Sequence, residues 1–131
     1  MVNILMEGEA MPDRSIVEAF AATVESNDHV AAIQKFYAAD ASTRENQNEP
    51  RLGRDKLAAR EQAMIDSCSK VFTKRLSPIF IDGDNSAIRW RFEFTFKNGT
   101  FKAMEEVALQ TWRGNEIVEE HFFYDPKQMA G

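Results

Sequence analysis

The last third of the chain, residues 85–126, constrains the fold more than any other segment. Two tight-turn sequences, Asn98-Gly99 and Gly114-Asn115, divide it into three runs in which apolar and polar residues alternate. Alternation with a period of two is typical of a strand with one buried face. Asn-Gly between two such runs favours a hairpin, because both residues tolerate the positive φ of a two-residue turn. The segment therefore predicts three consecutive antiparallel strands.

The first half of the chain shows helical spacing instead. Ser15 and Glu18 match a capping box, in which a hydroxyl and a carboxylate satisfy free backbone amides at the start of a helix. Asp28 is placed to cap a second, shorter helical pattern, and a third pattern begins near Asp55. These signals predict three helices before the strands.

Two further segments complete the expected fold. Residues 41–46 predict a short strand, and residues 48–53, which hold a proline and a glycine, predict a loop. Residues 71–81 predict a strand interrupted by Pro78, which an edge strand tolerates better than a central one. Helices first and an antiparallel meander afterwards indicate an α+β fold, with the helices covering one face of the sheet.

Composition narrows the class of protein. A length of 131 residues suggests a single domain over residues 1–131, with residues 1–13 as a flexible tail. The formal charge of -5 argues against a nucleic-acid partner, which normally requires a basic surface. No apolar run approaches the roughly 20 residues of a membrane helix. One cysteine, Cys68, and an N-terminus without a basic region indicate a cytoplasmic protein.

The sequence offers no pattern for a metal or a cofactor. His29 and His121 are the only histidines, and they lie on distant predicted elements without a second ligand at helical spacing. We expect His29 to be a solvated surface residue. The glycines mark turns and form neither a phosphate loop nor a dinucleotide-binding pattern. We therefore expect neither a metal nor a cofactor.

The first turn predicts which residues share a face of the sheet. A two-residue turn at Asn98-Gly99 pairs Phe96 with Phe101, and opposed residues share a face. Glu106 then lies opposite Arg91 as a surface ion pair. The opposite face becomes the core side, and a carboxylate, Glu105, stands on it. A carboxylate removed from water raises its pKa or needs a partner. It is either a functional group in a pocket or a rim residue with its head in water. The residues predicted on the core side of the sheet are Ile88, Trp90, Phe92, Phe94, Phe96, Phe101, Ala103, Glu105, Val107 and Leu109.

The second turn leaves two alternatives open. A two-residue turn at Gly114-Asn115 pairs Glu105 with Tyr124 and turns Val118, Glu120 and Phe122 into the pocket. It also creates an apolar patch on the back of the sheet, which a partner subunit would cover. A three-residue loop or a bulge would instead turn His121 and Asp125 inward. The residues predicted for the back patch are Met104, Trp112, Ile117, His121 and Phe123.

The order of helix, helix, short strand, helix and long strands is similar to the nuclear transport factor 2-like superfamily. Within it, the chain resembles the SnoaL-like group, which is polyketide cyclase-like and ketosteroid isomerase-like. The resemblance implies a cone of three helices on a curved antiparallel sheet, with one deep apolar pocket and commonly a homodimer. The superfamily includes isomerases, cyclases, dehydratases, hydrolases and non-catalytic binding proteins. The residues that carry the resemblance are Phe36-Tyr37-Ala38-Ala39-Asp40-Ala41, Arg44-Glu45-Asn46, Gly53-Arg54, Trp112-Arg113-Gly114-Asn115-Glu116-Ile117 and Phe122-Phe123-Tyr124-Asp125-Pro126.

Two hypotheses on function follow. In the first, the protein is a cofactor-independent acid–base enzyme of isomerase, cyclase or hydrolase type, acting on a small apolar carbonyl or polycyclic compound. A carboxylate in an apolar cavity can transfer a proton while a tyrosine stabilises a developing oxyanion. In the second, it is a non-catalytic small-molecule-binding or dimeric interaction domain. The candidate catalytic residues are Glu105, Tyr124, His121 and Asp125. The candidate binding residues are Tyr37, Glu45, Asn46, Trp90, Phe92, Val107 and Phe122.

Overall fold

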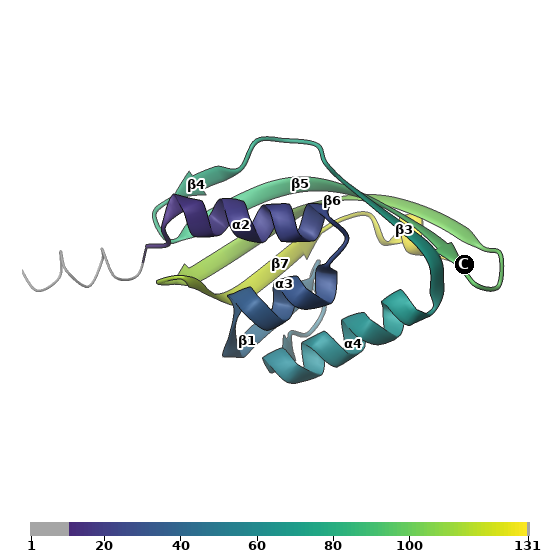
Figure 1. The fold of residues 1–131 in the computed structure, drawn as a ribbon, viewed down its shortest axis with the longest axis horizontal. Helices are drawn as coiled ribbons and strands as arrows, with labels where there is room; N and C mark the ends of the chain where they lie inside the picture. The colour runs from purple at the N-terminus through teal and green to yellow at the C-terminus, as the bar shows by residue number, and fades with distance from the viewer. Residues whose placement is uncertain (1–10, 131) are drawn as a thin grey trace, which may run out of the picture.

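The structure is a computed structural model that describes residues 11–130 (Figure 1). Its helices are α2 (Arg14–Glu25), α3 (His29–Phe36), α4 (Arg54–Asp66) and the 3-10 helix η1 (Pro126–Met129). Its strands are β1 (Tyr37–Glu45), β2 (Arg51–Leu52), β3 (Cys68–Arg75), β4 (Phe80–Asp82), β5 (Asn85–Phe96), β6 (Phe101–Arg113) and β7 (Glu116–Phe123). The predicted α+β order, with three α-helices before the meander, is confirmed. Most of the predicted tail lies outside the described residues.

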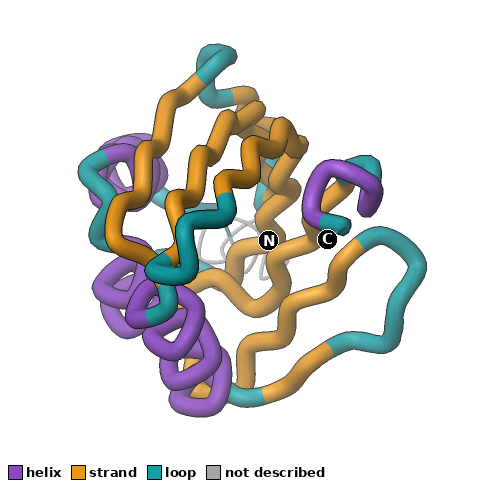
Figure 2. Tube along the Cα trace, turned by 90° about the vertical axis from the view of Figure 1, so that its right-hand side faces the viewer, coloured by secondary structure: helices purple, strands orange, loops and turns teal. Residues whose placement is uncertain are grey.

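The sheet has seven strands in the order β2-β1-β7-β6-β5-β3, and β4 pairs with β5 at one end. All pairs are antiparallel except β1 with β7, which run parallel. The long strands curve, and the three α-helices gather on one side of the sheet (Figures 1 and 2). The parallel pair brings the end of β1 beside the end of β7, and both ends contribute to the pocket.

The helix starts differ in detail from the prediction. Asp13, not Ser15, is the N-cap of α2, and its side chain makes no capping hydrogen bond. The predicted capping box was therefore wrong. Asp28 is the N-cap of α3, again without a side-chain hydrogen bond. The stability of these helices must come from their buried faces rather than from their caps.

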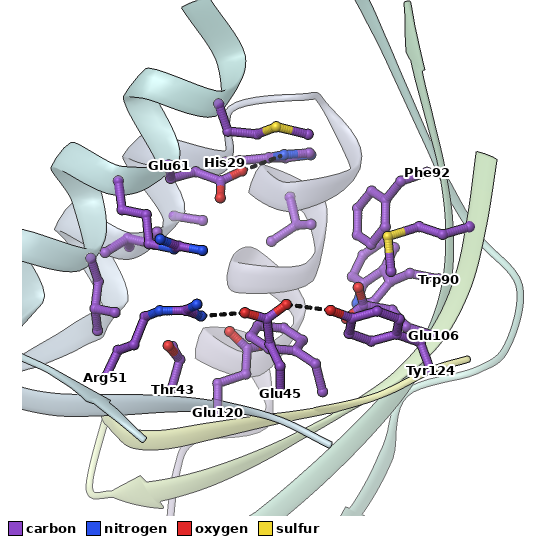
Figure 3. A pocket seen from close by; sticks show the side chains of 18 of the residues that line it. His29, Thr43, Glu45, Arg51, Glu61, Trp90, Phe92, Glu106, Glu120 and Tyr124 are labelled. Carbon is purple, nitrogen blue, oxygen red and sulfur yellow. Dashed lines mark hydrogen bonds and ion pairs between the residues drawn. The ribbon is translucent and has the colours of Figure 1, made fainter. Parts of the chain in front are cut away.

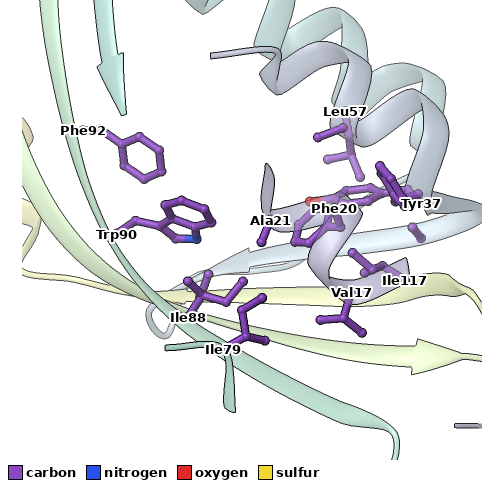
Figure 4. Close-up of a cluster of buried hydrophobic side chains, with 14 of the residues drawn as sticks. Val17, Phe20, Ala21, Tyr37, Leu57, Ile79, Ile88, Trp90, Phe92 and Ile117 are labelled. Atoms are coloured by element: carbon purple, nitrogen blue, oxygen red, sulfur yellow. The ribbon is translucent and has the colours of Figure 1, made fainter. Parts of the chain in front are cut away.

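The core lies between the helices and the inner face of the sheet (Figure 4). Phe20 of α2 meets Phe36 edge to face at 5.6 Å between ring centroids, and it meets Trp112 of β6 in the same way at 5.9 Å. Val17 and Ile117 beside them are fully buried. These contacts join the helices to the middle of the sheet and leave the other end of the inner face open to form a cavity.

The first hairpin has a three-residue loop, so the predicted two-residue turn was wrong. The amide of Phe96 donates to the carbonyl of Thr100 at 2.8 Å, and that of Gly99 donates to the carbonyl of Phe96 at 2.9 Å. Gly99 has a φ of 89°, as expected where a type I turn ends in a left-handed residue. Thr95, rather than Phe96, pairs with Phe101.

This change of one residue exchanges the two faces of β6. Met104, Glu106, Ala108 and Gln110 are buried toward the helices, opposite the inward-facing residues of β5. Glu105 lies opposite Arg91 on the outer face instead, so its predicted place on the core side was wrong.

The second hairpin confirms the two-residue turn but adds a bulge. Arg113 pairs with Glu116 and Trp112 pairs with Ile117, after which the register shifts so that Thr111 pairs with Glu119. The shift leaves one extra residue on β7, which lets residues on both sides of it face inward. Glu120 and Ile117 are therefore both buried.

The apolar patch predicted on the back of the sheet holds only some of the residues that were assigned to it. Met104, Trp112 and Ile117 are buried in the core. His121 and Phe123 stay on the outer face, where their rings stack at 4.0 Å between centroids.

The 3-10 helix η1 is held against the free edge of β6 by side-chain hydrogen bonds, one of which runs from Lys102 Nζ to the Met129 carbonyl at 2.7 Å. The Gln128 side chain accepts a hydrogen bond from the amide of Glu105 at 2.9 Å and donates one to its carbonyl at 3.0 Å. Gln128 thus takes the place of a neighbouring strand where β7 has ended. Met129, the next residue, lines the pocket.

Candidate active site

A cavity of about 620 Å³ lies between the helices and the inner face of the sheet. This size is typical of pockets for small organic molecules. Its wall is mainly aromatic and aliphatic, with Trp90, Phe92 and Phe94 stacked in sequence along β5. The ionisable residues that line it are His29, Glu45, Arg51, Arg60, Glu61, Glu106 and Glu120, with Tyr37 and Tyr124.

Glu106 is the polar group that the surrounding residues satisfy least. It lies on β6 directly opposite Trp90, and only 8% of its surface is exposed. Its Oε2 atom is buried and has no hydrogen-bond partner among the described residues. Burial first, and then the nearby charges of Glu120 and Glu45, raise the pKa of Glu106 well above its usual value. These effects favour the protonated carboxyl, whose O–H can donate a hydrogen bond into the cavity.

Glu120, in contrast to Glu106, accepts hydrogen bonds on both carboxylate oxygens and ends a chain of buried hydrogen bonds. The indole Nε1 of Trp112 donates to Ser86 Oγ at 2.8 Å, and Ser86 Oγ donates to Gln110 Oε1 at 2.6 Å. Gln110 Nε2 then donates to Glu120 Oε2 at 2.7 Å, and the Tyr37 hydroxyl donates to Glu120 Oε1. Because an indole N–H can only donate, the chain has one direction and ends on Glu120 as the acceptor.

Burial and hydrogen bonding act in opposite directions on the Glu120 carboxyl. Burial raises its pKa, while the hydrogen bonds from Tyr37 and Gln110 offset part of that rise. Burial, and then the charge of Glu120, also raise the pKa of Tyr37 well above its usual value. Glu106 and Glu120 are thus two buried carboxyl groups in one cavity, both with a raised pKa, and of the two Glu120 is the one with hydrogen-bond partners among the described residues.

Glu45 of β1 joins Tyr124 to Arg51 at one side of the cavity (Figure 3). It accepts hydrogen bonds from the Tyr124 hydroxyl and from the Arg51 guanidinium. Burial raises the pKa of Glu45, but these two hydrogen bonds, together with the charges of Arg51 and Arg60, outweigh it and leave the pKa lowered. Burial, followed by the hydrogen bond to Glu45, raises the pKa of Tyr124. This group is therefore a neutral phenol held by a carboxylate.

His29 and Glu61 lie at the opposite side of the cavity from Glu106 and Tyr124 (Figure 3). His29 Nδ1 is 3.3 Å from Glu61 Oε2, and His29 Nε2 is 2.8 Å from Thr73 Oγ1. The ring of His29 also meets Phe92 edge to face at 5.4 Å. His29 is only 8% exposed, so the prediction of a solvated surface residue was wrong.

The structure places six predicted site residues around the cavity and five elsewhere. Those that line it are Tyr37, Glu45, Trp90, Phe92, Phe122 and Tyr124. Glu105 lies on the outer face, where its carboxylate is 3.0 Å from Arg89 and 3.4 Å from Arg91. Val107 is on the same face and is 41% exposed. Asp125 is exposed and accepts a hydrogen bond from the amide of Lys127 at 3.0 Å, at the start of η1.

Asn46 and His121 position the site without lining the cavity. Asn46 Oδ1 accepts a hydrogen bond from the amide of Tyr124 at 2.9 Å, and His121 Nε2 lies 2.7 Å from the Asn46 carbonyl oxygen. Asn46 has a φ of 52°, a conformation that asparagine tolerates better than most residues. It fixes the chain just after β7 and so sets the direction of the Tyr124 ring.

Six ionisable residues of the cavity were not among the predicted site residues: His29, Arg51, Arg60, Glu61, Glu106 and Glu120. Of these, Glu120 was predicted on the pocket face by the two-residue second turn. A three-residue interpretation of the first loop would have placed Glu106 beside Trp90. Nothing in the local pattern marks His29 and Glu61, because they meet only when α3 packs on α4.

The comparisons with known proteins agree on one fold. The sequence profile of the SnoaL-like domain matches residues 17–120. A protein from Mesorhizobium loti, provisionally described as a SnoaL-like polyketide cyclase, is 26% identical with a TM-score of 0.71, covering 84% of this chain and 97% of its own. A Catenulispora acidiphila protein of ketosteroid isomerase-like fold, solved with trimethylamine, is 20% identical with a TM-score of 0.71 and 88% of each chain covered. TerC, co-crystallised with polyporic acid, is 14% identical with a TM-score of 0.70, covering 88% of this chain and 92% of its own.

The chain has the fold of a nuclear transport factor 2-like protein from Burkholderia pseudomallei, which is 12% identical with a TM-score of 0.72, covering 88% of this chain and 92% of its own. The chain belongs to the SnoaL-like domain family. No curated protein matches its sequence. Among residues 11–130, no group of three or more histidine, cysteine, aspartate or glutamate side chains could hold a metal ion. No helix in the described part of the chain is long and apolar enough to cross a membrane.

Proposed function

We propose that the protein is an acid–base enzyme that enolises a small, mostly apolar ketone with its own side chains. One observation supports this most: Glu106 is a buried carboxyl group without a hydrogen-bond partner among the described residues, on the wall of an apolar cavity. A protonated carboxyl in such a place can donate to a substrate carbonyl, because the neutral form is the one that burial favours. Ketosteroid isomerase uses a protonated aspartate in this way.

The matching base is the Glu61 carboxylate, which His29 positions. One oxygen of Glu61 lies near His29, and the residue lines the cavity at the side opposite Glu106. In the proposed step, the bond between the α-carbon and its hydrogen breaks and the proton bonds to Glu61. The electron pair forms the carbon–carbon double bond of the enol, and the carbonyl oxygen takes the proton of Glu106. The reverse steps return the ketone.

The remaining groups bind and orient the substrate. Trp90 and Phe92 offer flat faces to an aromatic or alicyclic ring, since they stack along the wall. Tyr124 lies beside Glu45 and gives the cavity a second neutral phenol in addition to Tyr37. Two proteins of this fold were crystallised with trimethylamine and polyporic acid, which supports a small molecule as the occupant.

The test follows hydrogen exchange in a ketone whose α-protons are acidic. The protein is mixed with 2-tetralone in deuterated buffer, and deuterium uptake at the α-carbons is followed by NMR. We expect the wild type to exceed buffer, and Glu106→Gln to lose about 100-fold or more of that rate, as for a general acid. Glu105→Gln is the matched control, because it changes a carboxylate one residue away on the outer face. Its rate should equal that of the wild type.

A second probe separates catalysis from binding. The compound 2-naphthol has the shape of the enol of 2-tetralone and fluoresces, so its binding can be titrated. If 2-naphthol binds but 2-tetralone gains deuterium no faster than in buffer, the enzymatic proposal fails. The alternative of a non-catalytic small-molecule-binding domain then stands.

We also propose that the protein forms a homodimer through the outer face of the sheet. Apolar side chains on this face, Phe72, Phe101, Val107 and Phe123, are between 39% and 57% exposed. Between these apolar side chains, Arg89 and Arg91 form ion pairs with Glu105. Because this network holds both positive and negative side chains, the same network of a second copy could pair with it across a two-fold axis.

A further inference from the structure

The positive charges of the pocket gather at one place, away from its buried carboxyl groups. A second hollow of about 410 Å³, open to solvent, adjoins the first. Six residues from β2, α4 and the segment before β2 line it, and four of them are exposed. Its lining includes three cations and no acidic side chain. These residues are Pro50, Arg51, Leu52, Lys56, Leu57 and Arg60. Arg51, Leu57 and Arg60 line the main cavity as well, so the two spaces meet at the two arginines.

Two of these three cations make no ion pair within the described residues, although the charge of Arg60 helps to lower the pKa of Glu45. Arg51 pairs with Glu45 through one guanidinium nitrogen. Lys56 and Arg60 make no ion pair or side-chain hydrogen bond with any residue from 11 to 130. Arg54, on the same helix, is by contrast paired with Asp55 at 3.3 Å.

The spacing of the two unpaired cations adds to the argument. Lys56 and Arg60 stand four residues apart on α4, so they project from the same side of the helix. Like charges at this spacing repel each other and weaken a helix. An anionic group placed between them would remove that repulsion and would receive hydrogen bonds from the Arg60 guanidinium, which suits carboxylates and phosphates.

We propose that the ligand of this pocket carries an anionic oxygen group, held by Arg60 and Lys56 with help from Arg51. This inference rests on the proposed function, because it extends the same ligand from the Glu106 wall to the α4 side. Such a ligand has a carbonyl or enol oxygen at one end, an apolar ring against Trp90 and Phe92, and a carboxylate or phosphate at the other end.

The experiment compares two fluorescent probes that share one ring system, 2-naphthol and 6-hydroxy-2-naphthoate. We expect the wild type to bind the carboxylate probe about tenfold more tightly, since a charge-assisted pairing of this kind contributes about that factor. Added salt should reduce this ratio, because the pairing is partly exposed. Arg60→Gln should bring the ratio close to one, and Lys56→Gln should lower it in part. Arg54→Gln, which lines neither cavity, is the matched control and should keep the wild-type ratio.

Failure of this inference differs from failure of the proposed function. If the wild type binds both probes equally, or if Arg60→Gln keeps the preference, the anionic group is ruled out even when 2-tetralone exchanges normally. Glu106→Gln should weaken both probes by the same factor and leave the ratio unchanged. If 2-tetralone does not exchange but the ratio behaves as expected, the anion site stands and the enzymatic step fails. Thermal melts of each variant verify that it is folded.

Discussion

Glu106 lies directly across the β5–β6 ladder from Trp90, on the wall of the cavity, while its neighbour Glu105 lies opposite Arg91 on the outer face. Two adjacent glutamates thus occupy opposite environments because side chains alternate along a strand. The length of the first hairpin loop decides which of them enters the pocket.

That loop depends on Gly99. Its φ of 89° is a conformation that side chains rarely adopt, although a Cβ there would meet no atom within 4 Å. We expect Gly99→Ala to lower the free energy of unfolding by about 1 kcal/mol through backbone strain alone, measured by urea denaturation. Lys97→Ala in the same loop should change it by less than about 0.5 kcal/mol. Equal stability of Gly99→Ala and the wild type would show that the loop is not held in this form.

Glu106 should make stability depend on pH. Burial raises its pKa in the folded protein, whereas in the unfolded chain it ionises from about pH 4 upward. Its contribution to the free energy of unfolding is therefore complete at lower pH and is lost as pH rises toward the folded-state pKa. Glu106→Gln removes this loss, so the variant should be more stable than the wild type at pH 8, by roughly 1 kcal/mol or more.

The difference in the free energy of unfolding between Glu106→Gln and the wild type should shrink as the pH falls to about 4 and below. There Glu106 carries the proton in both the folded and the unfolded chain. Denaturation at several pH values measures it. Glu105→Gln should not show the same pH dependence. A constant difference between Glu106→Gln and the wild type across this range would argue against a buried neutral carboxyl.

Tyr37 and Tyr124 should differ in their effect on stability. Tyr37→Phe removes a hydrogen-bond donor from Glu120, which is 5% exposed. It should lower the free energy of unfolding by about 1–3 kcal/mol at neutral pH. Tyr124→Phe should cost less, because Glu45 keeps its pairing with Arg51 and is partly exposed. Urea denaturation of both variants gives the comparison. A larger loss for Tyr124→Phe would contradict the account of the buried chain.

The dimer proposal is tested by sedimentation equilibrium at micromolar concentration. We expect a dimer for the wild type, and a monomer when Val107 and Phe123 are both replaced by glutamate, since charge on an apolar interface opposes association. Leu52→Glu, on the edge strand β2, should remain a dimer. A wild-type monomer would rule out the outer face as a stable interface.

Sequence patterns predicted the order of elements because each depends on local spacing and turn chemistry. They failed on the face of β6, for a physical reason. The sequence Asn98-Gly99 favoured a two-residue turn, whereas the loop has three residues, and this shift of one residue placed the apolar residues Phe101, Val107 and Leu109 on the wrong face. The inward positions of a strand are usually apolar, and exceptions to this pattern are expected mainly at functional sites.

Other parts of the site could not have been predicted from local patterns. His29 is buried by Glu61 and Thr73, which lie 32 and 44 residues further along the chain. The bulge in β7, which lets Ile117 and Glu120 both face inward, left no turn signal in the sequence. The aromatic wall of Trp90 and Phe92 was correctly predicted because β5 alternates regularly, and both residues line the cavity.

The protonation state of Glu106 tests the central claim most directly. The side-chain carboxyl carbons are labelled with ¹³C, the signal of Glu106 is assigned from its absence in Glu106→Gln, and its chemical shift is followed against pH. We predict the shift of a protonated carboxyl at neutral pH, with titration well above the usual range of glutamate. Titration of Glu106 near about 4.3, as for an exposed glutamate, would contradict the account.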